Sequence, residues 1–283
     1  MNVKEALLKG RRLLESIGSD EAPLEAELLL RHALSVDRVH LYQRLNDDIT
    51  PRQEHRYHRF LDRRLAREPT AYITGHREFF GLEFEVAPAA LIPRPETEVL
   101  VEIAIDFIQR QYADQPITVA DVGAGSGAIA VALAHTLPNI NVIATDTSKR
   151  ALKLAERNAA RHGVTGRIEF VHGNLLAPLD EPIDVIASNL PYVRTSDWEA
   201  LPPEIRGYEP KAALDGGVDG LRLIRRLLKQ APQHLKPGGA LFAEIGDEQG
   251  PLAEEAANTL VPNSDVHVRP DLAELDRVLC VYA

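Results

Sequence analysis

Long apolar runs are missing from this sequence of 283 residues. The longest, from Ala128 to Ala134, has seven residues, whereas a helix that crosses a bilayer needs about 18 to 20. The first six residues hold no apolar stretch of the kind that forms a signal peptide. These absences argue against a membrane-spanning or exported protein, and we expect a soluble protein of the cytoplasm.

Cysteine and clustered histidine are also scarce. Cys280 is the one cysteine, so it can form no internal disulfide and cannot build a thiolate metal site alone. The ten histidines are scattered along the chain without a close group, which argues against a zinc site. We therefore expect no metal.

Positive charge is in short supply outside the first part of the chain. Residues 1–80 carry 14 Lys and Arg against 13 Asp and Glu, and residues 81–283 carry 18 against 29, so the net charges are +1 and −11. A long polyanion such as duplex DNA is a poor partner for the acidic part. Segment 52–67 predicts an amphipathic helix with one basic face, formed by Arg52, Arg56, Arg59 and Arg63. This face is either an ordinary solvated surface or a docking surface for an acidic macromolecule.

The pattern of the sequence divides it into three parts. Residues 1–68 read as amphipathic helices, with Pro23 and the pair Thr50-Pro51 at positions typical of helix starts. In residues 69–95, apolar and polar residues alternate around a glycine, which is typical of a hairpin, and a proline-rich connector follows. From residue 96 on, strands alternate with helices. We predict a small N-terminal helical domain (1–68), a hairpin and linker (69–95) and a larger α/β domain (96–283).

The α/β part contains seven short strands whose apolar runs are nearly continuous. Such strands are buried on both faces, which indicates a mostly parallel, doubly wound sheet covered by helices on each side. The last two strands have no helix between them, so they predict a closing hairpin and hence one antiparallel strand. In sheets of this type, ligands bind beyond the carboxyl ends of the strands, where the strand order reverses.

A glycine turn follows the first of these strands. Residues 121–128 read Asp-Val-Gly-Ala-Gly-Ser-Gly-Ala, with glycine at Gly123, Gly125 and Gly127. Glycine lets the backbone approach a ligand closely, and the helix start just beyond favours a nucleotide-like cofactor. Asp146 ends the second strand, where a carboxylate can accept hydrogen bonds from ribose hydroxyls. The spacing fits both a dinucleotide and S-adenosylmethionine, and it excludes a P-loop because no Gly-Lys-Ser/Thr follows.

The chemistry is indicated by Asn189, Leu190, Pro191 and Tyr192, which follow the apolar strand 183–187 at the same edge of the sheet. A planar NH2 group is a poor nucleophile because its lone pair is delocalised. Two acceptors that hold both N–H bonds, the side-chain oxygen of Asn189 and the carbonyl oxygen of Leu190, would orient the nitrogen toward an electrophile. Pro191 stiffens the turn, and Tyr192 offers an aromatic face to the flat group. We favour this reading over an ordinary Asn-x-Pro turn.

Together these segments resemble the peptide chain release factor N5-glutamine methyltransferases. The tetrapeptide is similar to the Asn-Pro-Pro-Tyr signature of amino-methyltransferases, and residues 71–79, 92–98 and 209–221 are similar to segments of this family. The resemblance runs from about Pro69 to the C-terminus. It implies a class I S-adenosylmethionine-dependent methyltransferase fold, S-adenosylmethionine as cofactor, and methylation of the glutamine in the Gly-Gly-Gln loop of class I release factors.

The resemblance also implies roles for individual residues. It assigns cofactor binding to Gly123, Ala124, Gly125, Ser126, Gly127, Asp146, Asn174, Leu175 and Asn189. The pair Asn174-Leu175 departs from the family pattern, which has an acidic residue before a large apolar one beside the adenine. It assigns catalysis and the grip on the substrate glutamine to Asn189, Leu190, Pro191 and Tyr192, with leucine where the family has its first proline. Residues 94–97 match a family segment near the cofactor and the catalytic loop.

Other functions stay open from the sequence. A close relative methylates a glutamine of a ribosomal protein, and DNA adenine and RNA guanine N-methyltransferases share the tetrapeptide because exocyclic amines present the same problem. The acidic α/β part, without a basic nucleic-acid module larger than one helix, argues against direct binding of nucleic acid. A dinucleotide-dependent oxidoreductase or a non-catalytic binding protein is the alternative from another class. We expect a monomer whose N-terminal helices recognise the body of the release factor.

Overall fold

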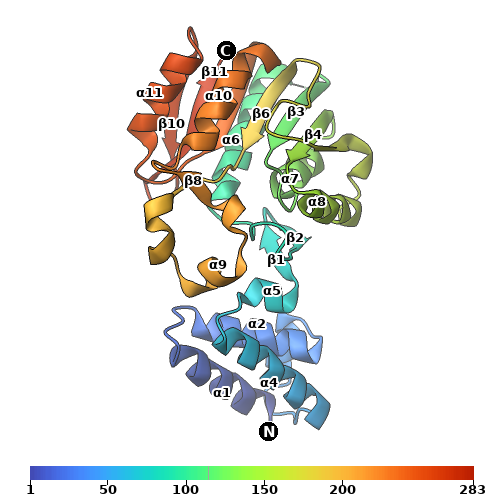
Figure 1. The fold of residues 1–283 in the computed structure, drawn as a ribbon. Helices are drawn as coiled ribbons and strands as arrows, with labels where there is room; N and C mark the ends of the chain where they lie inside the picture. The colour runs from blue at the N-terminus through green and yellow to red at the C-terminus, as the bar shows by residue number, and fades with distance from the viewer. Residues whose placement is uncertain (114) are drawn as a thin grey trace. The chain divides into compact units, whose positions relative to one another are not determined.

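The computed structural model describes residues 1–113 and 115–283, and the chain separates into two units (Figure 1). The first unit consists of Met1–His76 together with Pro202–Tyr208. The second consists of Arg77–Leu201 and Glu209–Ala283. The three-part division expected from the sequence stays a prediction.

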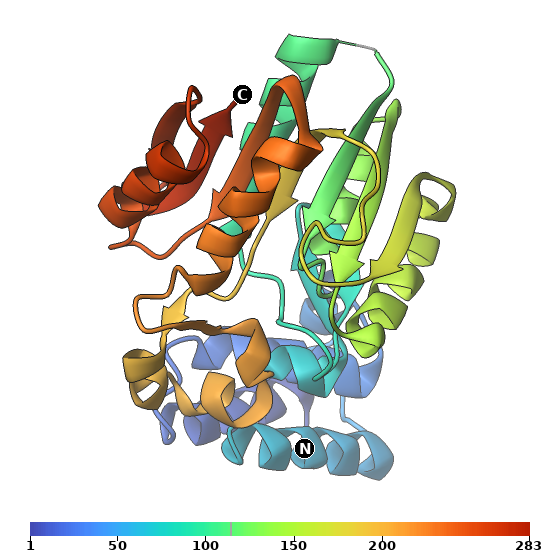
Figure 2. The same cartoon turned by 45° about the horizontal axis from the view of Figure 1, so that its top comes forward.

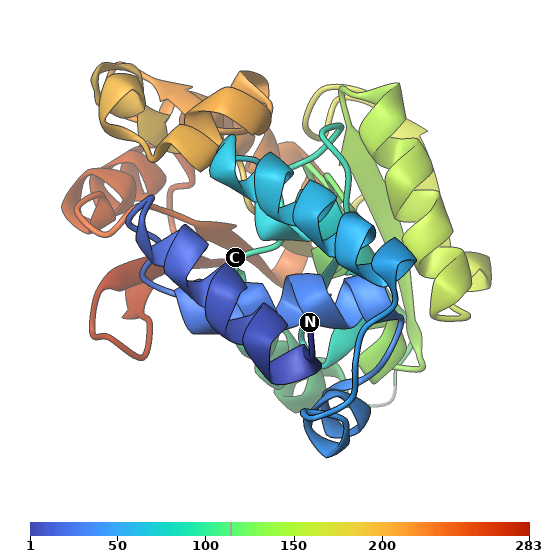
Figure 3. The ribbon, with the colours of Figure 1, turned by 90° about the horizontal axis from the view of Figure 1, so that it is seen from below.

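The first unit is built from helices. In chain order they are α1 (Val3–Glu15), α2 (Ala22–Leu34), α3 (Arg38–Gln43), α4 (Pro51–Leu65), α5 (Thr70–Thr74) and α9 (Pro203–Tyr208). α1 and α4 pack against α2, and Figure 3 shows these three helices side by side. As the sequence predicts, α4 begins at a cap, because the Thr50 hydroxyl accepts the N–H of Gln53 and the Gln53 side chain accepts the N–H of Thr50. The buried face of α4 carries Tyr57, Phe60 and Leu61, which confirms that this helix is amphipathic.

The predicted basic face of α4 is smaller in the structure than in the sequence. Arg56 lies over the ring of Phe60, with its guanidinium carbon 5.4 Å from the ring centroid. Arg63 pairs with Glu68 through two hydrogen bonds. The exposed arginines of this face for which the described residues contain no ion pair are Arg52 and Arg59. The candidate docking surface therefore reduces to these two positions.

One piece of the first unit comes from far along the chain. Arg64 of α4 is buried and binds Glu25 of α2 at 2.9 Å and Glu204 of α9 at 3.0 Å. Glu204 also binds Arg67 at 3.1 Å, and the hydroxyl of Tyr208 donates to the carbonyl at the C-terminal cap of α4 at 2.7 Å. A buried charge is stable only with such partners. This ion-pair cluster joins α9 to the N-terminal helices.

The second unit contains a hairpin and the α/β part. Its helices are α6 (Thr97–Tyr112), α7 (Ala128–Thr136), α8 (Lys149–Arg161), α10 (Arg222–His234) and α11 (Gly250–Leu260), with short 3-10 turns at Thr165–Arg167, Thr195–Ala200 and Lys211–Ala213. The hairpin strands are β1 (His76–Phe79) and β2 (Leu82–Glu85). The remaining strands are β3 (Ile117–Val122), β4 (Ile140–Asp146), β5 (Ile168–His172), β6 (Ile183–Ser188), β7 (Val193–Arg194), β8 (Asp215–Gly217), β9 (Leu235–Glu244), β10 (Asp265–Pro270) and β11 (Asp276–Tyr282).

Seven strands form one sheet in the order β10-β11-β9-β6-β3-β4-β5. β9, β6, β3, β4 and β5 are parallel, and β11 is antiparallel to both of its neighbours. This arrangement confirms the predicted fold class, including the single antiparallel strand. The sheet order reverses beside β3, so β3 and β6 lie at the switch point where ligands of such sheets bind.

Apolar layers cover both faces of the sheet. On one face, α6 and α7 pack on alternate side chains such as Val119 and Val142. On the other face, α10 and α11 pack on the intervening side chains such as Ala120 and Leu241; α10 lies in front of the sheet in Figure 2. Burial on both faces explains why the strands have continuous rather than alternating apolar runs.

The sequence did not predict the short pair β7 and β8, which are parallel and form a separate two-stranded sheet. β7 follows the tetrapeptide directly, and β8 lies in the segment that resembles the family at 209–221. No helix within the described ranges is long and apolar enough to cross a membrane.

Candidate active site

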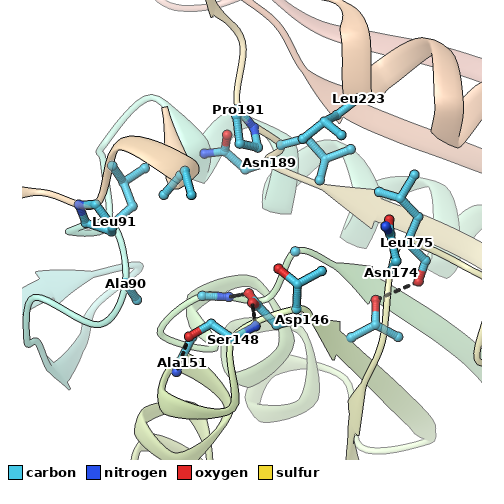
Figure 4. A pocket seen from close by; sticks show the side chains of 18 of the residues that line it. Ala90, Leu91, Asp146, Ser148, Ala151, Asn174, Leu175, Asn189, Pro191 and Leu223 are labelled. Carbon is cyan, nitrogen blue, oxygen red and sulfur yellow. Dashed lines mark hydrogen bonds between the residues drawn. The ribbon is translucent and has the colours of Figure 1, made fainter. Parts of the chain in front are cut away.

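The carboxyl ends of four parallel strands, β3, β4, β5 and β6, surround a cavity of about 690 Å³ (Figure 4). A volume of this size is in the range of small-molecule and cofactor sites. Asn189 and Pro191 lie on one side of the cavity and Asp146 and Ser148 on the other. The predicted positions that line it are Gly123, Gly125, Asp146, Asn174, Leu175, Asn189, Leu190 and Pro191.

The glycine turn is held against the next strand. The N–H groups of Gly123 and Ala124 both donate to the Thr145 carbonyl, at 2.8 and 3.0 Å. Gly127 has a φ of 79°, and a Cβ built on it would lie 2.9 Å from the Cβ of Ala155 in α8. Only glycine avoids both the strained backbone and this contact. The turn therefore packs tightly on α8, and its Gly123 and Gly125 backbone faces the cavity.

The hairpin supports the same turn. The buried side chain of Asn158 in α8 donates to the carbonyls of Ser126 and Glu85, at 2.9 and 3.0 Å, and accepts the N–H of Glu85 at 2.8 Å. Because one amide group serves both segments, the hairpin strand β2 and the glycine turn are fixed to each other.

Asp146 is connected to both flanking turns. Its Oδ2 accepts the N–H of Gly125 at 2.9 Å, and its Oδ1 accepts the N–H of Ser148 at 2.7 Å. A carboxylate has about four acceptor sites, so both oxygens can still accept a hydrogen bond from a ligand hydroxyl. The structure thus holds the carboxylate in one orientation at the edge of the cavity.

The loop after β5 forms another wall. Leu175 is buried with a φ of 55°, and its carbonyl accepts the Thr145 hydroxyl at 3.0 Å. The left-handed conformation costs about 1 kcal/mol or more for a leucine, and this hydrogen bond helps to hold it. Asn174 precedes it with an exposed side chain. Both residues of the unusual Asn-Leu pair line the cavity.

Asn189 has a defined orientation. Its Nδ2 donates to the hydroxyl of Thr97 at 2.9 Å, which leaves Oδ1 as the acceptor of this side chain. Leu190 is buried, and a Cβ on Gly123 would meet its Cδ2 at 3.0 Å. No donor to the Leu190 carbonyl is found in the described part of the chain. Within the described residues, neither of the two oxygens that are expected to hold the substrate amide, Asn189 Oδ1 and the Leu190 carbonyl oxygen, accepts a hydrogen bond.

Tyr192 is not among the residues that line the cavity. Its hydroxyl donates to Oε1 of Glu244 at 3.0 Å. Burial and the neighbouring Glu244 carboxylate raise the pKa of Tyr192 well above its usual range. The phenol is therefore protonated at neutral pH and cannot act as a base there. Its expected role as an aromatic face for the acceptor stays a prediction.

The segments that resemble the family meet around the tetrapeptide. Arg94 pairs with the buried Glu209, which also accepts the N–H of Ile92 at 3.1 Å. A Cβ on Gly216 would lie 2.6 Å from the carbonyl oxygen of Pro191, so the 209–221 loop lies directly against the tetrapeptide backbone. Residues far apart in the sequence thus build one site.

Three cationic side chains at the cavity were not predicted from the sequence. Lys211, Arg222 and Arg226 belong to its lining, together with Asp215. The Asp215 carboxylate accepts hydrogen bonds from the Thr195 hydroxyl and from the N–H of Gly217. Both hydrogen bonds lower the pKa of Asp215, and the one from Thr195 has the larger effect. No local pattern distinguishes these cations from the other charged residues of α10 and its preceding loop.

Several predicted cofactor positions support the cavity from behind. Ala124, Ser126 and Gly127 are buried and do not line it. Thr97 and Glu244 were missed as parts of the site. The position of Glu244 at the end of the buried strand β9, on the same edge as the glycine turn, is the sequence signal that could have indicated it.

Asp121, at the end of β3, is completely buried behind the glycine turn. Its Oδ2 accepts the N–H of Ala130 at 3.0 Å, and its Oδ1 makes no hydrogen bond within the described residues. Burial raises the pKa of Asp121 to about 7, and the Asp146 carboxylate adds to this while the Ala130 hydrogen bond opposes it. This carboxyl therefore titrates near neutral pH.

Comparison with protein families gives two matches. A model described as the PrmC N-terminal domain matches residues 5–75, and a model described as the methyltransferase small domain matches residues 102–201. A release factor glutamine methyltransferase of Moorella thermoacetica is 42% identical over 100% of this chain and 99% of its own length. Another, of Geobacter sulfurreducens, is 45% identical over 86% of this chain and 84% of its own length.

Solved structures are similar over part of the chain. The N-terminal domain of human METTL16 in complex with SAH matches with a TM-score of 0.52 and 19% identity, over 71% of this chain and 76% of that one. A methyltransferase from Pyrococcus furiosus matches with a TM-score of 0.51 and 20% identity, over 72% and 90%. At these identities the likeness shows the fold alone.

Proposed function

The chain belongs to the family of release factor glutamine methyltransferases, and from this we propose that it transfers a methyl group from S-adenosylmethionine to the side-chain amide nitrogen of a release factor glutamine. The membership confirms the resemblance read from the residues. This membership and the match to the methyltransferase small domain identify the chain as a methyltransferase. In the proposal, the glycine turn and Asp146 bind the cofactor, and the tetrapeptide binds the acceptor.

The residues around the glycine turn fit S-adenosylmethionine. Gly123 and Gly125 present backbone without side chains to the cavity, and Asp146 retains acceptor sites for ribose hydroxyls. Leu175 and Ala151 add apolar wall. When bound, the cofactor supplies a methyl group that its sulfonium charge has already activated. The work left to this chain is to bind, orient and exclude water.

The acceptor assignment depends on one observation, the hydrogen bond from Asn189 Nδ2 to Thr97. Because the NH2 group is used there, Oδ1 is available to accept one N–H of a carboxamide. In the proposal, the carbonyl of Leu190, which also lines the cavity, accepts the other. A glutamine amide held by both oxygens has a fixed plane, so its nitrogen lone pair can be aimed at the methyl group in line with the leaving sulfur.

The proposal needs no side chain as general base. The raised pKa of Tyr192, caused first by burial, keeps its hydroxyl protonated. The methylated nitrogen is acidic enough to release its proton to water after the transfer. The rate then depends mainly on how the acceptor amide is oriented. Variants that disturb the geometry of Asn189 should therefore affect turnover most.

The proposed substrate is the glutamine of the Gly-Gly-Gln loop in class I release factors, in the cytoplasm. The tetrapeptide takes only a small exposed side chain, so a second surface must select the protein that carries it. We propose that this second surface lies on the helical first unit, where Arg52 and Arg59 face an acidic region of the release factor.

Transfer of tritium from methyl-labelled S-adenosylmethionine to purified release factor tests the proposal. We expect incorporation into the intact release factor and none into a variant whose Gly-Gly-Gln glutamine is changed to alanine. Label in that control, or selective label in ribosomal proteins or nucleic acid offered in parallel, would contradict the assignment.

A charge-reversed variant tests the recognition surface separately. Arg52→Glu combined with Arg59→Glu should raise the KM for release factor about tenfold or more, because opposite charges become like charges, and should leave the Kd of S-adenosylmethionine unchanged. Arg12→Glu on α1 is the matched control, since Arg12 is also an exposed arginine of the first unit. Equal KM values in the reversed and control variants would exclude this surface.

A further inference from the structure

The buried side chain of Gln249 binds the backbone of the tetrapeptide without lining the cavity. Gln249 lies directly before α11. Its Nε2 donates to the carbonyl of Tyr192 at 2.8 Å and to the carbonyl of Asp219 at 3.1 Å. Its Oε1 accepts the N–H of Gly246 at 2.8 Å. One amide group thus joins the end of the tetrapeptide, the loop before α10 and the turn after β9.

The orientation of this amide follows from its partners. A backbone carbonyl only accepts a hydrogen bond, and a backbone N–H only donates one. The NH2 group of Gln249 must therefore face Tyr192 and Asp219, and its oxygen must face Gly246. Since the two donors and the acceptor are all used, this arrangement is the one that satisfies every partner of the buried amide.

A glycine beside Gln249 leaves the space for this contact. Gly220 has a φ of 81°, and a Cβ built on it would lie 2.1 Å from Nε2 of Gln249 and 2.1 Å from the carbonyl oxygen of Tyr192. A side chain at position 220 would therefore displace one or both groups. The amide and the tetrapeptide carbonyl are thus packed against backbone, which yields less readily than a side chain does.

From this arrangement we infer that Gln249 is a positioning residue, which fixes the carbonyl of Tyr192 and thereby directs the Leu190 carbonyl toward the acceptor. The inference deepens the proposed function and rests on it. Pro191 lies between the two carbonyl-bearing residues, and its ring fixes its φ. The Tyr192 hydroxyl is held as well, because it donates to Glu244 at 3.0 Å. With Tyr192 fixed at its carbonyl and at its hydroxyl, few dihedral angles remain that could turn the Leu190 carbonyl away.

The two oxygens of the proposed site have separate supports. The Asn189 side chain is oriented by its hydrogen bond to Thr97, at 2.9 Å. The Leu190 carbonyl accepts no hydrogen bond in the described part of the chain, so its direction depends on how the following residues are held. Loss of the Gln249 contacts should therefore misdirect this carbonyl and leave the cofactor side of the cavity unchanged.

Two variants separate this positioning from a role at the start of α11. Gln249→Met nearly keeps the length of the side chain and removes its polar groups. Gln249→Ser is too short to reach Tyr192, but serine at this position caps a helix well. Gln230→Met is the matched control, because the Gln230 side chain in α10 also accepts a backbone N–H, that of Leu176 at 3.0 Å, and does not line the cavity.

We expect kcat toward release factor to fall about 100-fold in both Gln249 variants, because a displacement of about 1 Å is enough for such a loss. The Kd of S-adenosylmethionine should stay within about threefold in both, and Gln230→Met should keep kcat within about threefold of wild type at saturating cofactor. Wild-type kcat in either Gln249 variant, or equal losses in Gln249→Met and Gln230→Met, would overturn the inference. If one Gln249 variant does not fold, the other decides.

A second readout does not require turnover. In protein labelled with carbon-13 at the leucine carbonyl and nitrogen-15 in proline, the bond between Leu190 and Pro191 gives a carbon–nitrogen correlation signal, which is identified by its loss in Pro191→Ala. The other Leu-Pro pairs, at 137–138 and 201–202, are internal references. The Leu190 signal should shift in both Gln249 variants and keep its position in the control variant.

An unchanged Leu190 signal in the Gln249 variants would refute the inference. A wild type that methylates no release factor would refute the proposed function instead, and the carbonyl signal would still report how Leu190 is held.

Discussion

Asp146 and Gly125 are joined by a hydrogen bond of 2.9 Å, from the N–H of the glycine to the carboxylate. This bond connects the end of β4 to the turn after β3, and the two segments form adjacent parts of the cavity lining. The proposed ribose acceptor and the proposed cofactor loop are therefore connected by a hydrogen bond within the protein itself. Preorganisation of this kind lowers the cost of binding.

Asp146→Asn should weaken binding of S-adenosylmethionine. Loss of a charge-assisted hydrogen bond costs about 1.5 to 3 kcal/mol, so we expect the Kd to rise roughly 10- to 100-fold. Calorimetric titration measures this, and kcat at saturating cofactor should stay near the wild-type value. Asp180→Asn, at an exposed aspartate outside the cavity lining, is the control. A Kd that changes equally in both variants would exclude Asp146 as a cofactor residue.

Gly127→Ala should destabilise the protein through a contact as well as through strain. Gly127 and Gly163 both have positive φ, 79° and 70°, but a Cβ on Gly163 meets nothing within 4 Å. We expect Gly163→Ala to cost about 1 kcal/mol from the backbone alone, and Gly127→Ala to cost about 3 kcal/mol because Ala155 must also shift. Urea unfolding measures both. Equal losses would show that the packing of α8 on the turn is not tight.

The raised pKa of Asp121 predicts a specific dependence of protein stability on pH. Its pKa is about 7 in the folded protein, mainly because of burial, against 3.8 for the ordinary group. Between these values the folded protein holds a proton that the unfolded chain has released, so this group makes stability fall as pH rises from about 4 to about 7.

Asp121→Asn removes this dependence. The free energy of unfolding of the variant, taken relative to wild type, should therefore rise by about 3 to 4 kcal/mol between low and neutral pH, from a shift of roughly three pKa units. Denaturant unfolding at a series of pH values measures the difference. A difference that is constant with pH would contradict the raised pKa.

Asn189→Ala should leave cofactor binding largely intact and abolish turnover. Removal of one oriented acceptor should lower kcat about 100- to 1,000-fold, by analogy with other preorganised polar groups. The Kd of S-adenosylmethionine and the tritium transfer rate are the two measurements. Asn141→Ala, at an exposed asparagine of β4 outside the cavity lining, is the control and should retain activity. Retained turnover in Asn189→Ala would exclude the proposed role of Asn189 in holding the substrate amide.

Local patterns predicted most of the α/β part. Its alternation of strands with helices and its one antiparallel strand follow the apolar patterns of the sequence. These elements are predictable because each buries one face of its own sequence. The glycine turn, Asp146 and Asn189 are also local signals, since each stands at the end of a strand.

Contacts between distant segments could not be predicted in this way. Glu204 pairs with Arg64 across 140 positions, and this pairing is what joins α9 to the first unit. Likewise, Asn189 and Thr97 are 92 positions apart. Nothing in either local segment specifies the partner, because the pairing depends on how the elements pack. The reduced basic face of α4 has the same cause, since Arg56 and Arg63 have partners within the first unit that helical spacing does not reveal.

The central claim is that two oxygens of the tetrapeptide hold a glutamine amide in line with the methyl donor. A crystal structure of the protein with release factor and S-adenosylhomocysteine tests it most directly. The account predicts that the glutamine nitrogen donates to Oδ1 of Asn189 and to the carbonyl of Leu190, with the cofactor sulfur behind it in line. A structure in which Asn189 is turned away, and other residues hold the glutamine, would contradict the account.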